Sequence, residues 1–186
     1  MLVTDAAEGD PQAWTALVER FSGLVWSVTR AYRLSPADAA DVCQTTWLRL
    51  VEHLGDIRDR ERVGAWLATT ARRECLLTLR KAGRAVPTEF DDDHLVSPDN
   101  TSDVDAGLDA GRYQAALWRA FEDLPERGRA LLRVLMADPA PSYAEAAAAL
   151  GMPIGSLGPT RARCLDRLRQ NSRLAGITPD LGGSLS

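Results

Sequence analysis

The chain has 186 residues, of which 45% are hydrophobic, so it can build one medium domain or two small ones. No apolar run approaches the about 20 residues that a membrane-spanning helix needs, and the N-terminus lacks the pattern of a secretory signal. We therefore expect a cytoplasmic protein that makes no membrane contact of its own. The three cysteines are far apart and odd in number, so no disulfide framework, metal site or cofactor is expected.

The net charge of −4 conceals an uneven distribution along the chain. Residues 62–84 hold six basic side chains and one acidic, a net charge of +5, and residues 155–173 hold five arginines and one aspartate, a net charge of +4. Between them, residues 85–110 hold eight acidic side chains and no Lys or Arg, a net charge of −8. Because charges beyond about 10 Å are largely screened, a partner responds to these local charges and not to the average.

Three helices are predicted in the N-terminal half. The first starts at Asp10-Pro11, an N-cap followed by proline at the first helical position, and the second starts in the same way at Ser35-Pro36. Gly55 is expected to end the second helix, and a third is expected over 63–81. Apolar residues at helical spacing predict their buried faces: Trp14, Leu17, Val18, Phe21, Leu24, Val25 and Val28; then Ala39, Val42, Thr46, Leu50 and Leu54; then Trp66, Leu67, Thr70, Leu77 and the aliphatic part of Arg80.

The C-terminal half repeats the helical pattern after a stretch with the composition of a linker. "YQAALWRAFEDL" stops at Pro125, "ERGRALLRVLMA" stops at Asp138-Pro139, and a short helix after Ser142 stops at Gly151. The last helix follows, and no strand alternation is seen. The sequence thus predicts an all-α chain of two small helical domains joined by a flexible acidic linker.

The short helix and the last one have the spacing of a helix-turn-helix. Ser142 and Glu145 form a capping box, Gly151 suits the left-handed turn, and Leu157 is the apolar residue that docks the second helix. The N-terminal side chains of such a second helix face the major groove of DNA. Because proline inside a helix costs about 3 kcal/mol, we expect this helix to start at Ser156 or slightly later, with Pro159 in its first turn.

Two stretches of the sequence resemble a known family. "DAADVCQTTWLRLVEHL" with "VGAWLATTARRECLLTLRKAGR" resembles the second conserved region of bacterial extracytoplasmic-function (ECF) sigma factors. "LWRAFEDLPERGRALLRVLMADPAPSYAEAAAALGMPIGSLGPTRARCLDRLR" resembles their fourth region. The resemblance implies a region-two-like domain over 1–84, an acidic linker over 85–110, a region-four-like helix-turn-helix domain over 111–173 and a disordered tail over 174–186.

The resemblance also implies roles for individual residues. Core RNA polymerase would contact Asp38, Asp41, Gln44, Thr45 and Arg49. The −10 promoter element would be recognised and opened by Arg62, Trp66, Arg72, Arg73, Arg80, Lys81 and Arg84, with a flipped base held by the loop 55–62. Trp66 could instead belong to the core, as its apolar spacing favours. The −35 element would be read by Ser142, Tyr143, Ser156, Gly158, Pro159, Thr160, Arg161, Arg163 and Arg167.

The function implied is a sigma factor that binds core RNA polymerase and promoter DNA, is monomeric when free, and has no catalytic residues. Control by an anti-sigma factor is expected. One alternative is a helix-turn-helix regulator that binds operator DNA without joining the polymerase. A metal-dependent enzyme using Asp91, Asp92, Asp93 and His94 is a more remote alternative, because that stretch shows no scaffold to fix a metal geometry.

Overall fold

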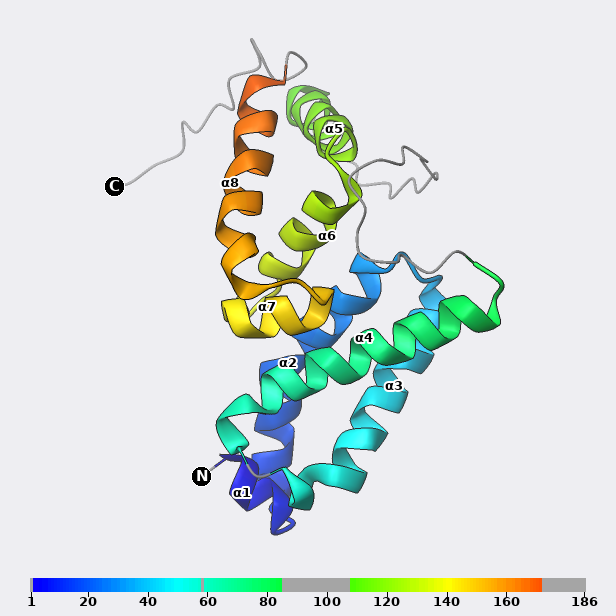
Figure 1. Cartoon of the computed structure of the whole chain (residues 1–186), viewed down its shortest axis with the longest axis vertical. Coiled ribbons are helices and arrows are strands. Elements are labelled where there is room, and N and C mark those ends of the chain that lie inside the picture. The colour runs from blue at the N-terminus through cyan, green and yellow to red at the C-terminus, as the bar shows by residue number, and fades with distance from the viewer. Residues whose placement is uncertain (1, 58, 85–107, 172–186) are drawn as a thin grey trace.

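The computed structural model describes residues 2–57, 59–84 and 108–171, and within these ranges it contains eight α-helices and no strand (Figure 1). The all-α prediction is confirmed. Residues 85–107 of the expected linker (85–110), with the acidic candidates Asp91 to His94, and the whole of the expected tail (174–186) lie outside the described residues. The helices are α1 (Leu2–Ala7), α2 (Pro11–Ala31), α3 (Pro36–His53), α4 (Val63–Lys81), α5 (Leu108–Glu122), α6 (Glu126–Leu135), α7 (Tyr143–Leu150) and α8 (Ile154–Gln170).

The first helices start where the capping residues predict. The Asp10 carboxylate accepts a hydrogen bond from the backbone N–H of Gln12 at 2.8 Å, and the Ser35 hydroxyl accepts one from the N–H of Asp38 at 3.2 Å. The end of α3 differs from the expectation: the helix stops at His53, and a 3-10 turn, Leu54–Asp56, follows it. Gly55 therefore lies inside that turn.

The buried face of α3 matches the predicted stripe, whereas that of α4 is displaced. Leu77 is 44% exposed, so its assignment to the core was wrong. The side chains that α4 buries are Val63, Gly64, Leu67, Ala68, Ala71, Cys75 and Leu79. Several of these are small, which lets another helix approach the backbone of α4 closely.

That other helix is α7, so the two halves of the chain pack together. Figure 1 shows α7 next to α2 and α4, and one hydrophobic core runs from α2 through α4 into α6 and α7. The Tyr32 hydroxyl donates to the Ala149 carbonyl at 3.4 Å across this contact. Gly64 is needed here, because a Cβ atom on it would overlap the Glu145 carboxylate and the Phe21 ring. We call this arrangement, in which the two halves are in contact, closed. The sequence did not predict it.

The expected start of the last helix was wrong. α8 begins at Ile154 after Pro153, with the Ser156 N–H and hydroxyl both donating to the Pro153 carbonyl, at 2.9 and 2.7 Å. Pro159 consequently lies inside the helix. Leu157, in the first turn of α8, is fully buried, and the helix starts two residues before Ser156, the earliest start that the proline rule predicts.

Two boundaries near the ends of the halves also differ from the prediction. The helix α1 was not predicted, because it is short and has no capping signal; it forms by burying Val3 and Ala6 against the neighbouring helices. α5 begins at Leu108, within the stretch expected to be linker.

Candidate nucleic-acid interface

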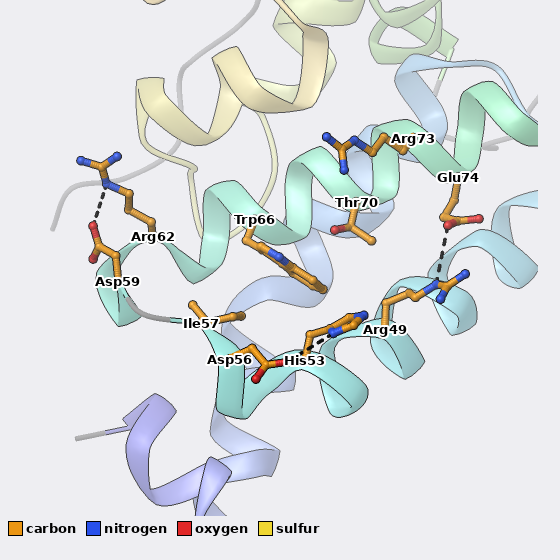
Figure 2. Close-up of a pocket in the computed structure, with 10 residues that line it drawn as sticks. All are labelled: Arg49, His53, Asp56, Ile57, Asp59, Arg62, Trp66, Thr70, Arg73 and Glu74. Carbon is orange, nitrogen blue, oxygen red and sulfur yellow. Dashed lines mark ion pairs between the residues drawn. The ribbon is translucent and has the colours of Figure 1, made fainter.

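A cavity of about 650 Å³ opens between the C-terminal end of α3, the turns that follow it and the first half of α4 (Figure 2). The turns include a second 3-10 segment, Arg60–Arg62. The cavity has the volume of a small-molecule or base pocket. It is lined by Arg49, His53, Asp56, Ile57, Asp59, Arg62, Trp66, Thr70, Arg73 and Glu74.

Most of the charged groups at this cavity are paired. Arg62 Nε lies 2.8 Å from Asp59 Oδ2, and Arg49 Nε lies 4.0 Å from Glu74 Oε1. Such exposed pairs are weak, about 0–1 kcal/mol, so a phosphate can compete for either guanidinium. Arg73 makes no ion pair within the described part of the chain.

Trp66 lies at the boundary between the core and the cavity. Its indole packs against the main core, yet it also lines the cavity, with its ring 6.3 Å from that of His53 at an angle of 62°. Figure 2 shows the indole lying between α4 and His53. A flat aromatic surface in a cavity of this volume is suited to stacking an unpaired base.

Five of the seven predicted −10 residues are exposed, and two, Trp66 and Arg72, are half-buried. Exposed side chains are Arg62, Arg73, Arg80, Lys81 and Arg84. Arg72 instead turns toward the helix-turn-helix: its guanidinium occupies the space beside Gly151, and its buried Nε has no hydrogen-bond partner. It contacts the Tyr32 hydroxyl, whose pKa burial raises and Arg72 partly lowers. Arg72 therefore lies in the contact between the two halves.

The outer face of α3 carries the residues expected to meet the polymerase. Asp41, Gln44 and Arg49 are exposed, and Asp38 and Thr45 are half-buried. The sequence reasoning missed two apolar side chains on the same face, Leu48 and Val51, which are 55% and 60% exposed. The sequence held a signal for their exposure, because both residues lie outside the apolar stripe that predicts the buried face of α3. Apolar side chains ringed by polar ones are typical of a protein-binding surface.

The helix-turn-helix has the predicted caps. The Glu145 carboxylate accepts from the Ser142 N–H at 2.7 Å, the Ser142 hydroxyl accepts from the Glu145 N–H at 3.3 Å, and Gly151 adopts a φ of +65°. The tight turn therefore sets α8 against α7 as the sequence motif requires.

The candidate −35 residues differ in exposure. Ser142, Tyr143, Pro159, Arg161, Arg163 and Arg167 are exposed, and Ser156 and Gly158 are half-buried. Thr160 is only 8% exposed, and its hydroxyl accepts from Arg163 at 3.4 Å. Its side chain is largely buried, unlike those of the arginines, and its contact with the −35 element stays a prediction.

Among the described residues, no three potential ligands cluster to hold a metal ion, and no helix is long and apolar enough to span a bilayer. What the described helices present is a helix-turn-helix with an arginine-bearing second helix, and a separate basic helix beside a base-sized cavity. These features are typical of a helical DNA-binding protein.

Comparison with known proteins identifies the family. The family model described as Sigma-70 region 2 matches residues 17–85. The ECF RNA polymerase sigma factor RpoE of Cereibacter sphaeroides is 34% identical over 134 residues, which cover 72% of this chain and 69% of that protein. The chain belongs to the ECF RNA polymerase sigma factors, the class of protein that joins core RNA polymerase and directs transcription initiation at promoters. The predicted family is confirmed, and the operator-binding regulator is set aside.

A solved structure supports the fold over most of the chain. The structure of CnrH in complex with the cytosolic domain of CnrY aligns with a TM-score of 0.56 and 20% sequence identity, covering 90% of this chain and 92% of that chain. At this identity the likeness concerns the fold, and it includes both halves.

Proposed function

We propose that the cavity between α3 and α4 holds a base flipped out of the −10 element, with Trp66 as its stacking surface. The single observation that carries this proposal is a base-sized cavity with an indole on its wall and Arg73 at its edge. Base stacking on an aromatic side chain contributes about 1–3 kcal/mol, and guanidinium groups along α4 would follow the phosphates of the separated strand.

The exposed face of α3 is the proposed docking surface for core polymerase. Leu48 and Val51 would supply the apolar centre, and Asp41, Gln44 and Arg49 the polar rim. α8 is the proposed reader of the −35 duplex, through Arg161, Arg163 and Arg167. The protein would act in the cytoplasm and perform no catalysis itself.

Control by an anti-sigma factor is part of the proposal. CnrH, whose fold this chain shares, was solved in complex with the cytosolic domain of CnrY. A partner that covers the apolar face of α3 would compete directly with the polymerase for Leu48 and Val51.

Run-off transcription with purified core polymerase, from the DNA upstream of the protein's own gene, tests the proposal as a whole. A one-to-one complex with core and a promoter-specific transcript are expected. Tight binding to that DNA without polymerase, and no complex with core, would contradict it.

The cavity is tested by permanganate footprinting of the melted promoter. Trp66→Ala should reduce open-complex formation about 5- to 150-fold, the equivalent of the lost stacking energy, while binding to core is unchanged. Trp66→Phe keeps a stacking ring and should retain most of the opening. Trp26→Ala, an exposed tryptophan on α2, is the matched control. If Trp66→Ala forms the open complex normally, the cavity does not hold a flipped base.

The docking and −35 surfaces are tested separately. Leu48→Glu should abolish binding to core. Leu77→Glu is the control, because Leu77 is an exposed leucine on α4, at 44% against 55% for Leu48. Arg163→Ala should weaken binding to the −35 duplex and leave core binding intact. If Leu48→Glu still binds core normally, α3 is not the docking surface.

A further inference from the structure

The short first helix, α1, contacts the turns that form one wall of the cavity. The Thr4 hydroxyl accepts a hydrogen bond from Arg60 Nη1, across 56 positions of the sequence. α1 also lies against the 3-10 turn Leu54–Asp56, and Figure 1 shows it at the same end of the molecule as the turns between α3 and α4. Both turns therefore meet a helix that the sequence did not predict and that has no part in the functions proposed above.

α1 is held in place by its own contacts with the first half of the chain. Val3 and Ala6 are buried in the main core. The chain turns back after α1 at Gly9, whose φ of +92° suits glycine, and the Asp10 N–H donates to the Asp5 carbonyl at 3.0 Å. A helix of six residues is not stable in isolation, so α1 owes its position to this packing and provides a fixed contact for the turns beside it.

The turn Arg60–Arg62 is exposed, and its other side-chain interactions within the described residues are local. The Asp59 carboxylate accepts from a backbone N–H of the turn at 3.2 Å, and its Oδ2 lies 2.8 Å from Arg62 Nε. Asp59 and Arg62 line the cavity, and Arg60 lies between them in the sequence with its side chain bound to Thr4. The bond between Thr4 and Arg60 therefore restrains the backbone that carries two cavity residues.

We infer that α1 is a positioning element for the cavity and that Thr4 is its positioning residue. The inference rests on the function proposed for the cavity, which is to hold a base flipped out of the −10 element. A base that leaves the stack loses its stacking energy until a formed pocket receives it. If the turn had first to become ordered, the conformational entropy of that ordering would add to the barrier to promoter opening. By holding Arg60, Thr4 removes part of that cost before DNA arrives.

The test is the rate of open-complex formation by holoenzyme reconstituted from the full chain and core polymerase, followed by permanganate footprinting. Thr4→Val removes the hydroxyl and keeps the shape of the side chain. It should slow opening about 2- to 5-fold, while the affinity for core and for the duplex promoter stays unchanged. Thr4→Ser keeps the hydroxyl and should retain the normal rate. Thr15→Val is the matched control, because Thr15 is an exposed threonine whose hydroxyl donates within α2, to the Pro11 carbonyl at 3.0 Å.

Two further measurements separate positioning from a general loss of stability. In an Arg60→Gln background, Thr4→Val should have no further effect on the rate of opening, because the two residues act through one bond. In the free chain, the backbone N–H groups of Glu61 and Arg62 both donate to Asp59, at 3.2 and 3.1 Å. Thr4→Val should speed their hydrogen exchange by a similar factor and leave exchange in α3 unchanged.

The outcomes distinguish this inference from the function on which it rests. Normal opening with Thr4→Val, when Trp66→Ala slows opening, overturns the inference and leaves the base-holding role of the cavity intact. If Trp66→Ala opens the promoter normally, the role of the cavity fails instead, and hydrogen exchange alone decides whether α1 positions the turn. Unchanged exchange of Glu61 and Arg62 in Thr4→Val overturns the inference in either case, as do additive effects of Thr4→Val and Arg60→Gln.

Discussion

Replacing Pro159 by alanine should stabilise the protein. α8 runs from Ile154 to Gln170, so an N–H at position 159 would donate to the Gly155 carbonyl, and proline has no N–H to give. Pro159 is exposed, and the substitution removes no buried contact. Proline in a helix interior costs about 3 kcal/mol relative to alanine, and less near the first turn, so we expect a gain of about 1–3 kcal/mol.

Differential scanning calorimetry measures this gain directly. For a chain of this length, 1 kcal/mol shifts the Tm by about 2–4 °C, so Pro159→Ala should raise it by about 2–12 °C. Gly155→Ala is the matched probe of the helix start, because a Cβ there meets open space. It should gain about 0.5–1 kcal/mol if residue 155 is helical.

A helix that began at Ser156 would give different results. Pro159 would then occupy the first turn, where no donor is lost, and Gly155 would precede the helix. If neither substitution raises the Tm, α8 does not start at Ile154, and the start at Ser156 that the proline rule predicts is correct.

Three further results are expected. Gly64→Ala forces its new Cβ against Glu145 and should cost about 1–3 kcal/mol, and small-angle scattering should show a larger radius of gyration as the halves separate; an unchanged radius would contradict the closed packing. Burial raises the pKa of Cys75 from 9.0 to about 12, so its thiol ionises first in the unfolded state. The free energy of unfolding should thus fall between pH 9 and 12, by up to about 1.4 kcal/mol per pH unit, and urea titrations of Cys75→Ala should lack this component. Ser142→Ala breaks the capping box and should cost about 1 kcal/mol by urea titration, whereas no loss would show that the box does not stabilise α7.

Local signals predicted most helix starts because the groups that decide them are near in sequence. Asp10 and Ser35 accept the first backbone N–H groups of the helices they precede, and Gly151 takes the left-handed conformation that its motif requires. The local rule for proline failed at Pro159, which lies inside α8 although it cannot donate a backbone hydrogen bond there.

The cavity was foreseen only in part. The loop 55–62 and Trp66 were named from the family resemblance, but His53, Thr70 and Glu74 were not. These three lie on two different helices, α3 and α4, and they meet only because the helices cross. The spacing of residues within one helix does not predict contacts between side chains of two helices. The charges of Arg62 and Arg73, in contrast, are evident from the sequence.

Arg72 shows why charge in a sequence does not by itself identify a DNA contact. It belongs to a segment with six basic side chains, and nothing in the order of residues separates it from Arg73. On α4 the two differ by 100° in direction, which turns Arg72 toward α7 and Arg73 toward the cavity. Its guanidinium lies beside Gly151 and the Tyr32 hydroxyl, between the two halves of the chain. Its direction on α4, which only the packing of α4 against α7 reveals, distinguishes Arg72 from Arg73, and the sequence alone could not.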